Sequence, residues 1–135
     1  MRLWDYRLLE YLPKSQLLAQ WRELNSIFKK QDKHILINYI YNYDKSYLQT
    51  YASIVINELE NRNYKIKNWD NFNKYFTQQE IPATNKIFNE HNNEYLTICY
   101  YNLKEKYLRG QKDFTKDVWE KLDNFYQNEI KGGKT

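Results

Sequence analysis

Residues that break regular secondary structure are scarce in this chain. Its 135 residues include only three glycines and two prolines, and two of the glycines fall among the last four positions. A turn-rich all-β fold needs such residues at its many turns, whereas long helices need few. We therefore expect an all-α protein, a single compact helical domain of about four to five helices over residues 1–130, with a disordered polar tail at residues 131–135.

Two segments show the apolar spacing of amphipathic helices most clearly. From Pro13 to Lys30, apolar side chains recur every three or four positions, at Leu17, Leu18, Trp21, Leu24, Ile27 and Phe28. A second set follows Asp44, a good N-cap residue, and continues to Asn61, with Tyr47, Leu48, Tyr51, Ile54, Val55 and Leu59. We expect Asn63 to end this second helix in the left-handed conformation.

The remaining segments carry weaker signals. Residues 35–43 are β-branched and aromatic and fit either a short strand or a buried helix; we expect a helical or irregular connection, because no partner strand is evident. Aromatic residues at 69–76 predict a short helix. The later part predicts a break at Pro82, a cap at Thr84, a helix over residues 85–109 with a possible break at 92–93, Gly110 at its end, and a last helix from Thr115 through Tyr126.

Several classes of protein are excluded by the composition. The chain has no apolar run of 18 or more residues, so it has no predicted membrane span. Asp5 is an early acid with no apolar segment behind it, which argues against a secretory signal. The single cysteine, Cys99, cannot form an internal disulfide. We expect a small cytoplasmic protein.

The sequence lacks the patterns of common cofactor sites. Three glycines exclude a glycine-rich phosphate loop. His34, His91 and Cys99 are too few and too scattered for a zinc site, so we expect neither a metal nor a cofactor. A nucleophilic pair of Cys99 with His91 is formally possible at a spacing of eight, but a small buried apolar role for Cys99 is the more common one.

The net charge of +4 is concentrated at the two ends of the chain. Residues 1–34 hold seven Lys or Arg against four Asp or Glu, and residues 99–135 hold eight against six. Such a balance permits a polyanionic partner without requiring one. Most of the aromatic side chains follow helical periods and should form core. The best candidates for stacking on nucleic-acid bases are Tyr100 and Tyr101 with Lys104, Lys106, Tyr107 and Arg109.

Residues 17–24, LLAQWREL, followed by Phe28 and then Lys33 and His34, resemble the first helix of the phage pyrimidine-dimer DNA glycosylase/AP lyase family, the endonuclease V type. That family has an aromatic-Arg-Glu-Leu motif, in which the arginine touches DNA and the glutamate is the catalytic carboxylate. The matching residues are Arg22 and Glu23.

The resemblance continues beyond a deletion of about twenty residues. Residues 42–45, NYDK, resemble the opening of the family's next long helix, and the family's spacing is kept at Glu58, Arg62, Tyr64 and Ile66. The similarity therefore covers about residues 1–66. Gln16 and Ser26 depart from it, because they stand where the family has a histidine and an arginine, and their loss lowers the expected attraction to phosphate.

The resemblance implies a nucleophile that is the free N-terminal α-amine, which forms a Schiff base with the sugar carbon C1′ of a damaged nucleotide. An α-amine has a reference pKa of about 7.7–8.0, so a useful fraction is neutral near pH 7. We expect Met1 to be retained, because Arg2 is too large for removal of the initiator residue, and to supply this amine if the chain has a one-residue insertion before the first helix. Without the insertion, the amine is displaced by up to about 3.8 Å.

The resemblance also assigns roles to the neighbouring residues. Glu23 would stabilise the developing sugar cation and move protons. Arg2, Arg22, Lys33 and His34 would bind the DNA, which is damaged or abasic duplex. Two alternatives stay open: a non-catalytic DNA-binding protein on the same helical scaffold, and a protein-interaction module unrelated to DNA.

Overall fold

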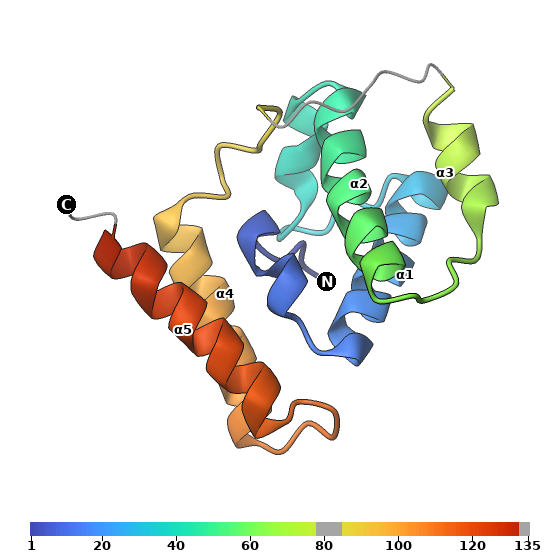
Figure 1. The fold of residues 1–135 in the computed structure, drawn as a ribbon. Helices are drawn as coiled ribbons and strands as arrows, with labels where there is room; N and C mark the ends of the chain where they lie inside the picture. The colour runs from blue at the N-terminus through green and yellow to red at the C-terminus, as the bar shows by residue number, and fades with distance from the viewer. Residues whose placement is uncertain (78–84, 133–135) are drawn as a thin grey trace.

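The computed structural model describes residues 1–77 and 85–132. Within those ranges the chain forms five α-helices and two 3-10 helices and no strand (Figure 1). In chain order they are η1 (Tyr6–Tyr11), α1 (Lys14–Lys30), η2 (Asn38–Asn42), α2 (Lys45–Asn61), α3 (Trp69–Tyr75), α4 (Asn93–Leu108) and α5 (Lys116–Gly132). The prediction of an all-α protein folded as a single domain is confirmed.

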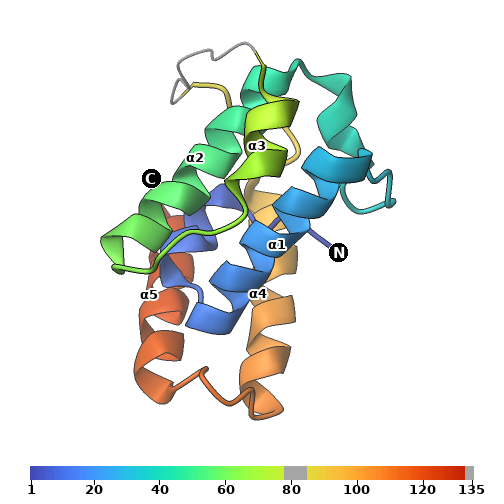
Figure 2. The same cartoon turned by 90° about the vertical axis from the view of Figure 1, so that its right-hand side faces the viewer.

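The helices form two groups on either side of the N-terminal residues. Helices α1, α2 and α3 pack together, and α4 and α5 lie side by side as an antiparallel pair (Figures 1 and 2). The short helix η1 packs between the groups, because it contacts both α2 and α5. The residues of η1 therefore lie where the two groups of helices meet.

The strongest predicted helix boundaries are confirmed. Pro13 is the N-cap of α1, one position outside the helix. The side chain of Asp44 caps α2 by accepting the backbone N–H of Ser46. Asn63 follows α2 in the left-handed conformation, with φ of 62°. Thr115 precedes α5 and accepts the backbone N–H of Val118 at 3.3 Å. Each of these signals depends on residues only a few positions apart.

The prediction of a helix over residues 85–109 is wrong in its first part. The helix α4 begins only at Asn93, because the side chain of Asn92 caps it by accepting the backbone N–H of Tyr95. The preceding residues are not helical, and they bury Phe88 and His91 against the η2–α2 region. The predicted break at Pro82 and cap at Thr84 lie outside the described residues.

The other end of the chain also differs from the prediction. Helix α5 continues to Gly132, so the first two residues of the predicted disordered tail are helical; the other three lie outside the described residues. The predicted connection over residues 35–43 is confirmed, since it consists of a turn followed by η2. None of the helices in the described ranges is long and apolar enough to cross a membrane.

Aromatic side chains fill both groups of helices. Trp21 and Phe28 of α1 meet Phe72 of α3, with ring centroids 5.7 Å apart for Phe28 and Phe72. Between α4 and α5, the ring of Tyr100 stacks on that of Tyr126 at 3.8 Å. Tyr100 is therefore buried core and is wrong as a base-stacking residue, whereas its neighbour Tyr101 is exposed.

Candidate functional site

The first six residues are here called the N-terminal segment (residues 1–6); residues 1–5 are non-helical and Tyr6 begins η1, and the backbone is held by hydrogen bonds at almost every position. Leu3 and Trp4 bury their side chains in the core. The hydroxyl of Tyr51 donates to the carbonyl of Trp4 at 2.7 Å, and the hydroxyl of Tyr95 donates to that of Leu3 at 2.5 Å. These contacts fix the direction in which the chain end points.

Gln20 on α1 links the N-terminal segment to the residue predicted to be catalytic. Its side chain is fully buried. The Oε1 atom accepts the backbone N–H of Trp4 at 2.8 Å, and the Nε2 atom donates to the carbonyl of Arg2 at 3.2 Å and to the Glu23 carboxylate at 3.0 Å. Because residues three apart share one face of a helix, Gln20 and Glu23 both face the N-terminal segment.

Glu23 is a partly buried carboxylate. Desolvation is the largest influence on it and raises its pKa above the ordinary value for glutamate. The positive charge of the N-terminal amine, hydrogen bonds from the Arg2 backbone and the Gln20 amide, and the charge of Arg22 act in the opposite direction. The result is a carboxylate that takes up a proton more readily than an exposed glutamate, beside the chain end.

The structure brings Met1, Arg2 and Glu23 together, although the amine and the carboxylate are not a contact pair. Among the described residues, no ion pair within 4.0 Å joins the Met1 nitrogen to Glu23, so the amine acts on the carboxylate at longer range. The guanidinium of Arg2 lies over two aromatic rings, with its central carbon 5.9 Å from the Trp4 centroid and 5.7 Å from that of Tyr95.

The other predicted DNA-binding residues lie outside this cluster. Arg22 is adjacent to Glu23 on α1 and is exposed. Lys33 and His34 are exposed in the turn that follows α1, which ends at Lys30. That end is seven residues from Glu23, or about 10 Å along the helix. Lys33 and His34 therefore extend the candidate site along the molecule and do not surround the carboxylate.

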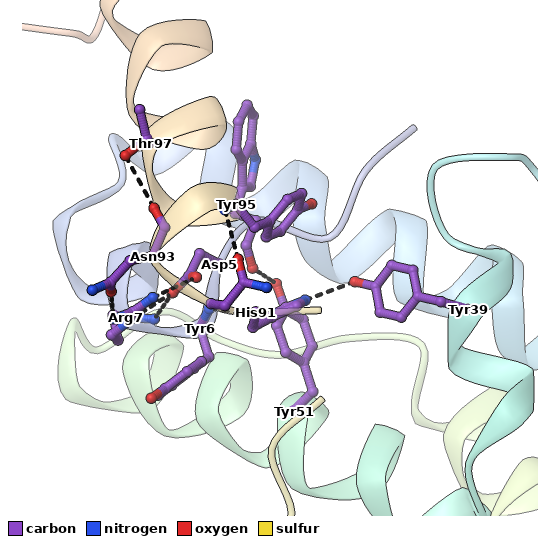
Figure 3. A network of polar contacts seen from close by, with 11 residues as sticks. Asp5, Tyr6, Arg7, Tyr39, Tyr51, His91, Asn93, Tyr95 and Thr97 are labelled. Carbon is purple, nitrogen blue, oxygen red and sulfur yellow. Dashed lines mark hydrogen bonds and ion pairs between the residues drawn. The ribbon is translucent and has the colours of Figure 1, made fainter. Parts of the chain in front are cut away.

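A second polar network supports the N-terminal segment from the opposite side (Figure 3). Asp5 is fully buried and forms an ion pair with Arg7, at 3.0 Å between Oδ1 and Nε. The backbone N–H of Tyr6 donates to Nδ1 of His91 at 3.3 Å, and Nε2 of His91 lies 2.6 Å from the Tyr39 hydroxyl. Burial lowers the pKa of His91 to about 4, so the ring is neutral at pH 7.

These contacts exclude a nucleophilic pair of Cys99 with His91. Both ring nitrogens of His91 are engaged by Tyr6 and Tyr39. Cys99 is fully buried, and desolvation raises the pKa of its thiol to about 11. A thiol of that kind is a poor nucleophile near pH 7, because the thiolate is the reactive form. Cys99 is the small buried residue that the sequence suggested.

The sequence missed the residues that hold the N-terminal segment. Gln20 could have been noticed, because it is a polar residue within the apolar stripe of α1 and a buried polar side chain needs hydrogen-bond partners. The sequence does not say which residues those partners are. Nothing in the sequence pointed to Tyr51, His91 or Tyr95, because each contacts the N-terminal segment across 47 or more positions of the chain. Among the described residues, no cluster of three or more histidine, cysteine or acidic side chains could hold a metal ion.

Comparison with known proteins identifies a family. A sequence model of the pyrimidine dimer DNA glycosylase family matches residues 1–71, which contain the N-terminal segment, α1 with Gln20, Arg22 and Glu23, and α2 with Tyr51. No curated protein and no solved structure matches the chain. Since the match covers more than half of the 135 residues, the chain belongs to the pyrimidine dimer DNA glycosylase family.

Proposed function

We propose that the protein is a DNA glycosylase/AP lyase that uses the α-amine of Met1 as the nucleophile on damaged DNA. The observation that carries this proposal is the placement of the chain end. A hydrogen-bonded N-terminal segment leads to a partly buried glutamate whose pKa responds to the charge of the amine. The family to which the chain belongs acts on DNA, which supplies the substrate class.

The proposed reaction has two stages. The amine nitrogen attacks C1′ of the damaged nucleotide, and the bond from C1′ to the base breaks, so that the base departs with the bonding electron pair and takes up a proton. Ring opening then gives an iminium between the Met1 nitrogen and C1′. Removal of a C2′ proton expels the 3′ phosphate by elimination, and water releases the Schiff base.

Glu23 suits the proton transfers of this sequence. A carboxylate with a raised pKa accepts a proton near neutral pH more readily than an exposed one, and can return it later. Its negative charge also stabilises the positive charge that develops at C1′. A reacting carbon must lie within reach of both groups, so a direct ion pair of Met1 with Glu23 is not required.

Arginine and lysine side chains supply the proposed contacts to the DNA backbone. Arg22 in the middle of α1 and Lys33 and His34 beyond its end are all exposed, which supports a role for them in binding phosphates. Arg2 is partly covered by the Trp4 and Tyr95 rings, which hold its guanidinium near the chain end. Each phosphate contact should contribute to the salt dependence of DNA binding.

Borohydride trapping on DNA that contains an abasic site tests the proposal. We expect one covalent adduct between the full chain and the DNA, with Met1 shown by intact mass to be present and unmodified. The matched control carries two additional residues before Met1, which keeps a free amine but moves it away from Glu23, and should trap far less. A wild-type chain that gives no adduct, where another amine-dependent lyase does, is not a lyase. Salt-dependent binding without any adduct would favour the non-catalytic DNA-binding alternative.

A further inference from the structure

The turn between α1 and η2 exposes two large apolar side chains at its tip. Ile35 is 78% exposed and Leu36 is 41% exposed. They occupy the central positions of a turn in which the N–H of Ile37 donates to the carbonyl of His34 at 2.9 Å. Such positions favour glycine, asparagine, aspartate and proline, so neither local conformation nor core packing accounts for this pair.

The turn is held in place by hydrogen bonds. The backbone N–H of His34 donates to the Asp32 side chain at 3.0 Å, and that of Leu36 donates to Nδ1 of His34 at 3.2 Å. The hydroxyl of Tyr41 donates to the carbonyl of Asp32 at 2.6 Å, and Ile37 is fully buried behind the tip. Ile35 and Leu36 are therefore presented to solvent by a braced turn.

Positive charge precedes the exposed pair along the chain. Lys29, Lys30 and Lys33 are exposed at the end of α1 and in the turn, and Asp32 is the only acid between residues 29 and 36. None of the three lysines joins the ion pairs formed within the described residues. An apolar tip that follows a run of lysines outside any ion pair is complementary to DNA, in which apolar stacked bases are flanked by negatively charged phosphates.

The turn lies on the same side of the molecule as the candidate active site. Both ribbon views place the N-terminus and the chain between α1 and η2 near one another, and Figure 2 shows both projecting to the right. The connection is also bonded, because Tyr39 of η2 meets His91, which accepts the backbone N–H of Tyr6 (Figure 3).

We infer that Ile35 and Leu36 form a wedge that enters duplex DNA at a base step beside the damaged nucleotide. Apolar side chains inserted between base pairs unstack them and kink the helix, and glycosylases open the base stack of duplex DNA at the damaged site. The lysines would hold the adjacent phosphates while the tip replaces the lost stacking. This inference rests on the proposed function and names the means by which the same site reaches its substrate.

Another exposed apolar pair in the described residues provides a matched control. Ile98 and Leu108 of α4 are 43% and 69% exposed, but their helix carries acids as well as bases, including the Glu105–Arg109 ion pair. The wedge variant combines Ile35→Ser with Leu36→Ser, and the control variant combines Ile98→Ser with Leu108→Ser. All four positions are exposed, so both variants should unfold at the wild-type temperature.

The probe is a duplex that contains a non-cleavable tetrahydrofuran abasic analogue, with 2-aminopurine beside it as a reporter of unstacking. We expect the wild type and the control variant to raise the 2-aminopurine fluorescence at saturation. The wedge variant should give no rise, and its affinity for this duplex should fall roughly tenfold, as loss of a stack-replacing side chain implies. Its affinity for undamaged duplex and its salt dependence should stay at wild-type values, because all lysines are retained.

Borohydride trapping on a single-stranded abasic oligonucleotide separates this inference from the proposed function, because that substrate has no stack to open. The wedge variant should trap like the wild type there. The wedge is overturned if its variant keeps the fluorescence rise, if the wild type traps but produces no rise, or if the variant loses affinity for undamaged duplex equally. A wild type that unstacks the duplex but gives no adduct would retain the wedge and overturn the amine chemistry.

Discussion

Two sets of side chains hold the N-terminal segment, and they come from different halves of the chain. Gln20 of α1 and Tyr51 of α2 belong to the part that matches the family, residues 1–71. His91 and Tyr95 belong to the part beyond it. Of these four residues, Gln20 also bonds Glu23, whereas neither His91 nor Tyr95 does.

This difference separates two tasks within one site. Gln20 fixes the carboxylate and the N-terminal segment relative to one another, because the same amide group bonds both. Tyr95 of α4 and His91, just before that helix, bond the backbone of the segment at Leu3 and Tyr6 and do not bond Glu23. Changes in the matched half can therefore act on the carboxylate itself, whereas changes in the second half should reach the chemistry only through the position of the amine.

The largest effect on adduct formation is expected at Glu23, the carboxylate that the matched half of the chain supplies. Glu23→Gln keeps the size of the side chain and an oxygen that can accept from Gln20, so folding and DNA affinity should be unchanged. Loss of the proton-transferring group should slow adduct formation and strand cleavage by about 10²–10⁴-fold. Glu60→Gln, at an exposed position of α2, is the control. A rate within threefold of wild type would remove Glu23 from the mechanism.

Breaking the link within the matched half should mainly lower stability. Gln20→Leu leaves the buried N–H of Trp4 without its acceptor, and each such orphaned group costs about 1–3 kcal/mol. Urea unfolding should show this loss in the free energy of unfolding. Gln16→Leu, on the same helix but bonded only to Gln111 near the surface, should cost less than about 1 kcal/mol. Equal losses in the two variants would show that Gln20 has no special part in holding the segment.

The same division describes what the sequence could predict. The boundaries of α1 and α2 followed from local signals, such as the Asp44 cap and the apolar spacing. The possible break at 92–93 coincides with the start of α4, but the non-helical course of residues 85–92 did not follow from such signals, because it accompanies the burial of Phe88 and His91 against Tyr39, about fifty positions earlier. Helical periodicity contains no information about partners so far along the chain.

The candidate site divides in the same way. Arg22 and Glu23 stand in a motif that can be read directly from the sequence, and the family match includes them. Tyr95 is one of 14 tyrosines, and nothing in its own neighbourhood separates it from those that only fill core. Its contact with Leu3 spans 92 positions, so only the fold identifies it. The parts of the site set by short-range pattern were predictable, and those set by long-range packing were not.

Low pH should reduce the stability that His91, in the second half of the chain, gives to the folded protein. Burial lowers the pKa of His91 from 6.5 to about 4, so between these values the unfolded chain binds a proton that the folded chain does not. The stability that the neutral ring provides is therefore full above pH 6.5 and is lost as the pH falls toward 4. From pH 7 to pH 5 this amounts to about 2 kcal/mol.

Urea unfolding at pH 7 and pH 5 measures this loss, with His91→Gln as the comparison. The glutamine variant should be less stable at pH 7, because the amide does not reproduce both contacts of the ring, but it should lose about 2 kcal/mol less between the two pH values. Parallel losses in the two proteins would assign the pH dependence to other groups.

The smallest effect on the rate of borohydride trapping is expected from removal of a single hydroxyl on α4, that of Tyr95. This variant can be compared directly with the removal of another hydroxyl from the same helix. Tyr95→Phe removes the hydrogen bond to the Leu3 carbonyl but keeps the ring that lies under Arg2. Tyr100→Phe, on the same helix, removes a hydroxyl that bonds Asp123 of α5 instead of the N-terminal segment. Each should lower the free energy of unfolding by about 1 kcal/mol.

Only the first should slow borohydride trapping, by roughly three- to tenfold, since a loosened segment aims the amine less well. The loss should appear in the rate at saturating DNA and leave affinity unchanged. Equal slowing by both variants would mean that α4 acts through general stability, and the division between the two halves of the molecule would then be wrong.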